Sequence, residues 1–125
     1  MEIKSFQDLL LWQKGHQFVL EIYKLTREFP GEERFGLISQ IRRSSVSICA
    51  NIAEGGKKSR NDFIRFLVIA DGSLEETKYH LILSKDLEYL NLEKFKVLSM
   101  QADEIGRILN ALIRSLRSKQ SYYNS

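Results

Sequence analysis

Apolar residues recur every three or four positions over four long stretches of this chain, and only a few residues separate one stretch from the next. That spacing places the side chains on one face of an α-helix, because the helix completes a turn in about 3.6 residues. Short connections between long helices make sequential neighbours antiparallel. The sequence therefore predicts an all-α fold, an antiparallel up-down-up-down four-helix bundle.

Helix-capping and helix-stopping residues separate the four stretches. They are, in chain order, Ser5 with Asp8, Pro30-Gly31, Gly55-Gly56, Ser59 and Asn91. We expect a single domain, residues 1–125, with helices at about 6–28, 33–54, 59–88 and 92–119. Residues 120–125 are expected to fray.

Each predicted helix has one apolar stripe that should face the core. The stripe of the first helix is Leu9, Trp12, His16, Val19 and Tyr23. The stripe of the second is Leu37, Ile41, Ser44, Ile48 and Ile52. The stripe of the third is Phe63, Leu67, Ala70, Leu74, Thr77 and Leu81. The stripe of the fourth is Leu98, Ala102, Ile105, Leu109, Leu112 and Leu116.

The second and third predicted helices carry apolar residues beyond these stripes. The additional residues are Ile38, Val46, Cys49, Ile64, Val68, Tyr79 and Ile82. A four-helix bundle buries about one stripe per helix, so a second apolar face predicts a surface for self-association. The alternative is a broader core within one molecule.

Arg42 falls within this second apolar flank and is assigned to the same oligomer contact. A buried guanidinium without a partner costs several kcal/mol, so we expect an ion pair. The candidate carboxylates are Glu54, Asp71, Glu75 and Glu76. Contact with a nucleic acid and a catalytic role are the alternatives for this arginine.

The sequence contains no constellation typical of a catalytic or metal site. The two histidines, His16 and His80, lack neighbouring ligands at metal-site spacing. Cys49 has no evident partner base, so we interpret it as a small buried hydrophobe. Neither histidine follows an arginine as it would in a HEPN-type RNase. We expect no enzymatic activity, no metal ion and no cofactor.

Basic residues form two clusters, although the net charge of the chain is only +3. The first surrounds the start of the third helix: Lys57, Lys58, Arg60 and Arg65. The second is on the fourth helix, where Lys96, Arg107 and Arg114 form a ridge flanked by Asn110 and Arg117. Asp103 sits in this ridge and should weaken it, and Lys119 follows in the basic tail. Arg43 lies on the polar side of the second helix. These residues predict sequence-independent, salt-sensitive binding of RNA or DNA phosphates; an ordinary solvated surface is the alternative.

The single cysteine excludes an internal disulfide and suits a reducing compartment. No apolar run approaches the roughly 20 residues that a membrane-spanning helix needs, and no secretory signal is recognisable. We expect a cytoplasmic protein without a membrane partner.

The longest distinctive run is FGLISQIRRSSVSICANIAEG, from Phe35 to Gly55. Further marks are LWQK at 11–14, Ile22-Tyr23, Phe29-Pro30 and FLVIADGSL at 66–74 with Glu76. Through these residues the chain resembles a bacterial four-helix-bundle family encoded in intervening sequences of 23S ribosomal RNA genes. A related branch is the accessory variability determinant of diversity-generating retroelements.

The resemblance implies barrel-shaped homopentamers of antiparallel four-helix bundles. The retroelement branch implies binding of nucleic acid and of a reverse transcriptase through a basic surface. The chain departs from the family pattern at Cys49, where many relatives carry a kink-favouring proline, and at Lys78, where the family has an acidic residue. The fourth helix carries little of the family pattern, so its basic ridge depends on its own charges.

Taken together, these features predict a non-enzymatic homo-oligomer, a pentamer by resemblance, that binds RNA or DNA through its basic surfaces. A reverse transcriptase or another protein is a further candidate partner. The rival hypothesis is a protein–protein interaction module with no nucleic-acid role, in which the charges only maintain solubility.

Overall fold

The computed structural model describes residues 5–124, and the side chains of residues 5–119. Four long helices make up most of the described chain: α1 (Leu10–Thr26), α2 (Leu37–Gly55), α3 (Arg60–Asp86) and α4 (Leu92–Asn124). Two short 3₁₀ helices, η1 (Phe6–Asp8) and η2 (Gly31–Glu33), precede α1 and α2. None of the described helices combines the length and apolar character needed to cross a bilayer.

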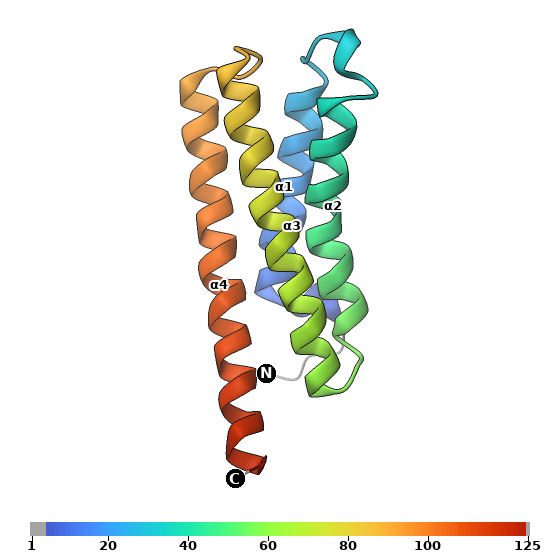
Figure 1. The fold of residues 1–125 in the computed structure, drawn as a ribbon, viewed down its shortest axis with the longest axis vertical. Coiled ribbons are helices and arrows are strands. Elements are labelled where there is room, and N and C mark those ends of the chain that lie inside the picture. The colour runs from blue at the N-terminus through green and yellow to red at the C-terminus, as the bar shows by residue number, and fades with distance from the viewer. Residues whose placement is uncertain (1–4, 125) are drawn as a thin grey trace.

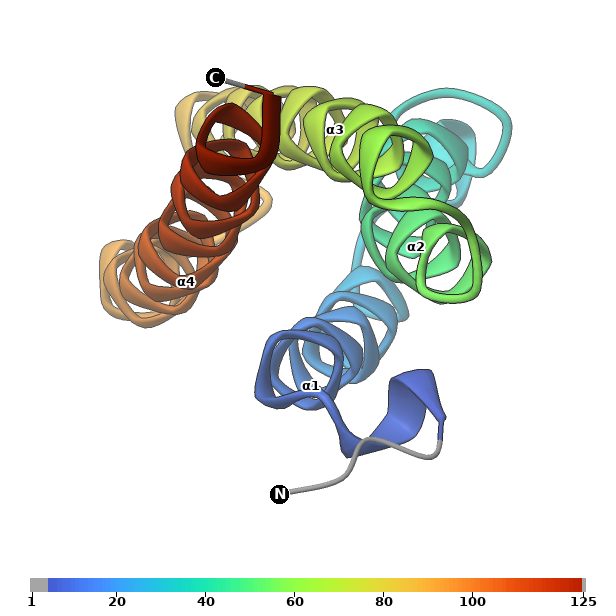
Figure 2. The ribbon, with the colours of Figure 1, turned by 90° about the horizontal axis from the view of Figure 1, so that it is seen from below.

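The four helices run alternately up and down, and each packs against the next in the chain (Figure 1). α1 also packs against α4, which makes the arrangement a four-helix bundle. Viewed from below, α1 and α4 diverge from one another, whereas α2 and α3 lie side by side (Figure 2). The all-α prediction is confirmed, with one side of the bundle more open than the others.

The predicted caps are present, but the first caps the short helix η1 and not the long helix α1. Ser5 accepts a hydrogen bond from the Gln7 amide, and its own amide donates to Asp8, which closes η1. An extended Leu9 then separates η1 from α1, so the continuous helix expected at 6–28 is split. Ser59 accepts from the Asp62 amide at the start of α3.

The fourth helix begins as expected and continues further than its predicted end. Asn91 Oδ1 accepts from the Lys94 amide at 2.8 Å. α4 then runs to Asn124, and its C-terminal end extends beyond the ends of the neighbouring helices (Figure 1). The expected fraying at 120–125 falls on residues whose side chains, and at Ser125 also the backbone, lie outside the described part.

The predicted stripes of α2 and α3 face the core. All five residues of the α2 stripe are buried, as are all of the α3 stripe except the half-buried Phe63. In α4 the buried position shifts from Leu112 to Ile113, which is 4% exposed. Ile48 and Leu74, both fully buried, are examples of the aliphatic packing that stabilises the contacts among α2, α3 and α4.

The predicted stripe of α1 lies at the edge of the buried face, where Leu9 and Trp12 pack against the core only in part. The helix buries Leu11, Gly15, Phe18, Val19, Ile22, Leu25 and Thr26. Of the predicted stripe only Val19 is buried, and Trp12 is half-buried in a stack with His16 and against Phe6 of η1. The buried series and the predicted stripe both follow helical spacing. The Trp12 side of α1 packs against Phe6 of η1, and a continuous helix from residue 6, as predicted, would not have placed η1 there.

Candidate nucleic-acid interface

The ten predicted nucleic-acid-binding residues all have exposed side chains. They are Arg43, Lys57, Lys58, Arg60, Arg65, Lys96, Arg107, Arg114, Arg117 and Lys119. Exposure is the first requirement for contact with phosphates. It is also ordinary for basic residues, so the surrounding charges decide which of them could act together.

Arg107 and Arg114 line a cleft between α3 and α4 with a volume of about 490 Å³. Three acidic or amide side chains of this cleft, those of Glu75, Asp103 and Asn110, contact residues other than the two arginines. Lys78 binds Glu75 at 3.1 Å and Asp103 at 3.3 Å.

Burial opposes the charge of this lysine, but the hydrogen bonds with both carboxylates outweigh it and raise the pKa of Lys78. Asp103 had been expected to weaken the ridge, and Lys78 partly neutralises it. Asn110 donates to Asp71 Oδ1 at 3.2 Å, which ties the centre of α4 to α3.

The C-terminal part of α4 is the most uniformly basic region. Residues 107–119, which we call the basic arm, contain Arg107, Arg114, Arg117 and Lys119 and no acidic residue. None of these four forms an ion pair with a residue that the structure describes. The arm packs against the bundle through the buried Leu109 and Ile113, and its C-terminal end points toward the part of α4 that extends beyond the other helices (Figure 1).

The cluster near the start of α3 is less uniform. Arg65 pairs with Asp62 at 3.1 Å and lies over the Phe66 ring. Lys57 and Lys58 stand in the α2–α3 connection, which lies toward the same end of the bundle as the basic arm (Figure 1). The fold therefore brings this cluster and the arm to one end.

Two predicted members stand apart from that end. Lys96 lies in the second turn of α4, toward the opposite end of the bundle, so it does not extend the basic arm. Arg43 lies on α2, beyond the α3 helix that separates α2 from α4. The ten residues thus do not form one continuous patch within a monomer.

The predicted oligomer residues divide into exposed and buried sets. Val46, Val68, Tyr79 and Ile82 are 40%, 45%, 58% and 44% exposed on α2 and α3. Ile38 is half-buried and packs against the core. Cys49 and Ile64, both 8% exposed, are already covered within the monomer, so they do not contribute to a surface for a partner.

Arg42 does not form the predicted ion pair. Its Nε donates to Thr26 Oγ1 at 2.8 Å and its Nη2 to the Tyr23 carbonyl at 3.4 Å. The guanidinium carbon lies 4.5 Å from the centre of the Tyr23 ring. A cation near the last turn of a helix satisfies unpaired carbonyls and the negative end of the helix dipole, so the end of α1 takes the place of a carboxylate.

Cys49 faces α1 at a very close helix contact. A Cβ atom added to Gly15 would lie 2.9 Å from Cys49 Sγ, so glycine is what lets the two helices approach. Burial raises the pKa of the Cys49 thiol to about 11. The thiol is therefore protonated near neutral pH, as expected for a structural cysteine.

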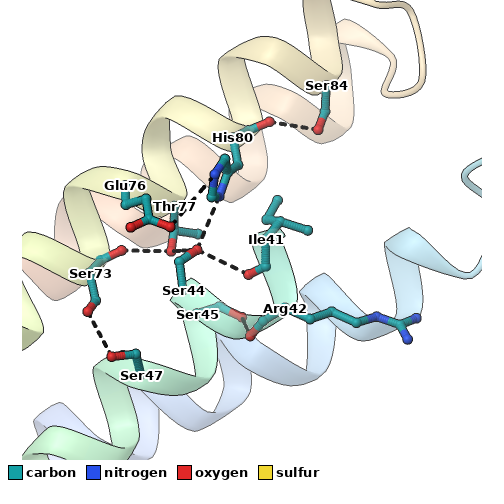
Figure 3. A network of polar contacts seen from close by, with 10 residues as sticks. All are labelled: Ile41, Arg42, Ser44, Ser45, Ser47, Ser73, Glu76, Thr77, His80 and Ser84. Carbon is teal, nitrogen blue, oxygen red and sulfur yellow. Dashed lines mark hydrogen bonds and ion pairs between the residues drawn. The ribbon is translucent and has the colours of Figure 1, made fainter. Parts of the chain in front are cut away.

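A buried polar network between α2 and α3 was not anticipated from the sequence (Figure 3). Ser44 Oγ lies 2.7 Å from Thr77 Oγ1 and 3.2 Å from His80 Nδ1, and His80 Nε2 lies 3.8 Å from Glu76. The Ser84 hydroxyl donates to the His80 carbonyl at 2.7 Å. The sequence signal that could have indicated this network is the helical spacing of the polar residues Thr77, His80 and Ser84 on the buried side of α3.

The hydroxyl protons of this network suit a neutral His80. Ser44 accepts from Thr77 and has one hydroxyl proton, which it can donate either to His80 Nδ1 or to the Ile41 carbonyl at 3.2 Å; in the second case the neutral ring donates from Nδ1 to Ser44. Burial lowers the pKa of His80, although the Glu76 charge opposes the shift. Ser44 and His80 are 4% and 8% exposed, so this serine–histidine–carboxylate set is closed to a substrate.

Residues 7–111 match the family model described as 23S rRNA-intervening sequence protein. The match spans well over half of the chain. The chain belongs to the 23S rRNA-intervening sequence protein family. The family resemblance of the Phe35–Gly55 run is thereby confirmed.

A solved relative supports this membership in the intervening sequence protein family. It is the crystal structure of a protein with unknown function from the S23 ribosomal protein family of Bacteroides thetaiotaomicron. It is 33% identical in sequence, with a TM-score of 0.75 over 83% of this chain and 98% of that chain. No curated protein matched the chain.

Two departures from the intervening sequence protein pattern can now be placed. α2 is an uninterrupted helix across Cys49, the position at which a proline would favour a kink. Lys78 bridges Glu75 on its own helix and Asp103 on α4, so the reversed charge links two helices. Within the described residues, no group of three potential ligands could hold a metal ion.

Proposed function

We propose that this intervening sequence protein is a non-enzymatic, homo-oligomeric scaffold that binds RNA or DNA phosphates through its basic arm. The observation that carries the proposal is the run of four exposed cations at 107–119 with no acidic residue among them. Lys57 and Lys58, toward the same end of the bundle, are proposed to extend this surface.

The dimensions of the arm suit a nucleic-acid backbone. A helix rises about 1.5 Å per residue, so residues 107–119 span roughly 18 Å and can follow several phosphates. Duplex DNA carries a phosphate about every 3.4 Å along each strand. Contacts of this kind release counterions, so the proposed affinity is independent of sequence and falls steeply with salt.

Self-association would repeat the arm and strengthen weak binding by avidity. The exposed apolar residues Val46, Val68, Tyr79 and Ile82 support a contact between copies, because such residues on adjacent helices are typical of interaction surfaces. A pentamer is the assembly that the family resemblance implies. A protein partner, such as a reverse transcriptase, would occupy surface left free by this assembly.

The test is titration of structured RNA and of duplex DNA with the purified protein at about 50 mM and 200 mM salt, a range over which phosphate binding weakens strongly. We expect salt-sensitive binding by the wild type. The double substitution Arg107→Glu and Arg114→Glu should abolish binding without unfolding the helix, because both side chains are exposed.

Arg27→Glu is the matched control, since Arg27 is an exposed cation at the C-cap of α1, toward the opposite end of the bundle. It should reduce affinity far less than the double substitution. Unchanged affinity of the double variant would overturn the arm assignment. Absence of binding at low salt, with one protein recovered stoichiometrically from a pull-down, would favour the protein–protein module instead.

A further inference from the structure

The most exposed large apolar side chain described is that of Phe35, at 88%. It lies in the connection between η2 and α2, beside the exposed Arg34, whose guanidinium carbon is 5.5 Å from the ring centre. A phenylalanine so fully in water gains nothing from the fold of its own chain. The Arg34–Phe35 pair therefore presents an uncovered aromatic ring with an adjacent cation.

The connection that presents Phe35 is held firmly. Glu33 accepts from the Leu37 amide at 3.2 Å with one carboxylate oxygen and from the Tyr89 hydroxyl at 3.0 Å with the other. A Cβ atom on Gly36 would lie 2.7 Å from that carboxylate, so glycine allows the clamp to form. An aromatic side chain on a preorganised loop loses little entropy on binding, which is typical of an interface anchor.

A groove of complementary character lies between α1 and α4 at the same end of the bundle. It has a volume of about 620 Å³ and includes the apolar side chains of Leu25, Val97 and Leu98. Its carboxylates are those of Glu21, Glu28 and Glu93, which outnumber its two lysines, Lys24 and Lys94. An aromatic ring with an adjacent arginine matches an apolar groove with an acidic excess.

We infer that the Arg34–Phe35 pair of one copy inserts into the α1/α4 groove of a second copy. The connection before α2 and the open side between α1 and α4 lie on opposite sides of the bundle, near the same end (Figures 1 and 2). A contact between two different patches of the same chain is heterologous. When each copy is rotated from the last by a fraction of a full turn, repeating this contact closes a ring.

This inference rests on the self-association in the proposed function and specifies its contact. Helix α2, which carries the exposed Val46, lies on the same side of the molecule as the connection before it (Figure 2), so this helix would border the contact. The basic arm lies toward the opposite end and stays available for nucleic acid. Assembly and nucleic-acid binding can therefore be broken separately.

The first test is the mass of the full chain by light scattering over a concentration series. Truncation of an interface anchor is expected to be costly, so Phe35→Ala should raise the concentration of half-assembly about tenfold or more. Leu87→Ala is the matched control, since Leu87 is 44% exposed at the C-cap of α3 and outside the groove. It should assemble as the wild type does.

Charge exchange gives a specific second test. Arg34→Glu should weaken assembly, and adding Glu28→Arg should restore it in part, which a merely structural role of either residue would not predict. An equal mixture of Arg34→Cys and Lys94→Cys chains should form the mixed disulfide in preference to either like pair. The buried Cys49 should stay out of this reaction.

Wild-type assembly of Phe35→Ala, or like-pair disulfides in the mixture, would overturn this contact while leaving the proposed function standing. A wild-type chain that remains a monomer at every concentration would overturn both the contact and the proposed oligomer. Loss of RNA binding by an arm variant that still assembles bears only on the proposed function.

Discussion

The α2–α3 and α1–α4 contacts differ in how completely they are closed. Between α2 and α3, hydroxyl groups and His80 are hydrogen-bonded inside an apolar interface, and Gly55 lies against Phe66. Between α1 and α4, a partly exposed ion pair joins Lys14 to Glu104, and the groove lies further along the same two helices, at residues 21–28 and 91–98. The α2–α3 contact is satisfied within the monomer, whereas the α1–α4 contact leaves an open groove with apolar and acidic side chains.

The difference predicts where substitutions should act on folding and where they should act on the proposed association. Buried polar groups must find partners inside the chain, so the α2–α3 network favours one relative placement of the two helices. An exposed pair such as Lys14–Glu104 contributes little, because water screens it. Perturbations of α2–α3 should therefore act on folding, and perturbations of α1–α4 mainly on association.

The largest expected effect comes from filling a close contact between the end of α2 and α3. A Cβ atom on Gly55 would lie 2.7 Å from Phe66 Cβ, so Gly55→Ala should lower the free energy of unfolding by about 1–3 kcal/mol through overpacking. Urea denaturation measures this. Gly56→Ala is the neighbouring control, with its nearest contact at 3.5 Å; an equal loss there would contradict the packing argument.

A smaller effect is expected from the buried histidine, and it depends on pH. Burial lowers the pKa of His80 below the ordinary value near 6.5, so the unfolded chain takes up a proton first as the pH falls. The stability that His80 contributes is complete above about pH 6.5 and is lost progressively below it.

His80→Gln should therefore lower stability near neutral pH, by on the order of 1 kcal/mol for the lost hydrogen bonds, and should flatten the decline toward acid. Denaturation midpoints at several pH values give both quantities. His16→Gln, which leaves the α2–α3 network intact, should retain the wild-type decline. A decline of wild-type steepness in His80→Gln would assign the pH dependence to other groups.

The smallest effect is expected at the open side. Lys14→Met removes the ion pair with Glu104, whose pKa is lowered mainly by its hydrogen bond with Lys14. Water screens a pair of this kind, so its contribution to stability is small and the thermal midpoint should hardly move. A loss comparable to that of Gly55→Ala would show that the α1–α4 contact is as important for folding as the α2–α3 contact.

The sequence was most informative where one periodicity dominated. The stripe from Leu37 to Ile52 and the caps at Ser59 and Asn91 were predictable, because helical spacing and capping are local. In α1, two series of apolar residues share that spacing. The buried series, with Phe18 and Ile22, is distinguished only by the position of η1 and the other helices.

The candidate interface was predictable as a list of charges but not as a surface. The absence of acidic residues after Glu104 is visible in the sequence, whereas the separation of Lys96 from the basic arm depends on the length and direction of α4. Likewise, no local pattern indicates that Arg42 would bind the end of α1, because its partners are 16 and 19 residues away.

The sequence by itself determined the four helices, their antiparallel order and the family of the chain. Apolar periodicity indicates the helices, the short connections indicate their order, and the Phe35–Gly55 run indicates the family. The tertiary structure decided which face of α1 is buried, which apolar residues remain exposed, and that His80 joins the Ser44 and Thr77 hydroxyl groups. Those outcomes depend on side chains far apart in the chain competing for one interior, and packing alone resolves that competition.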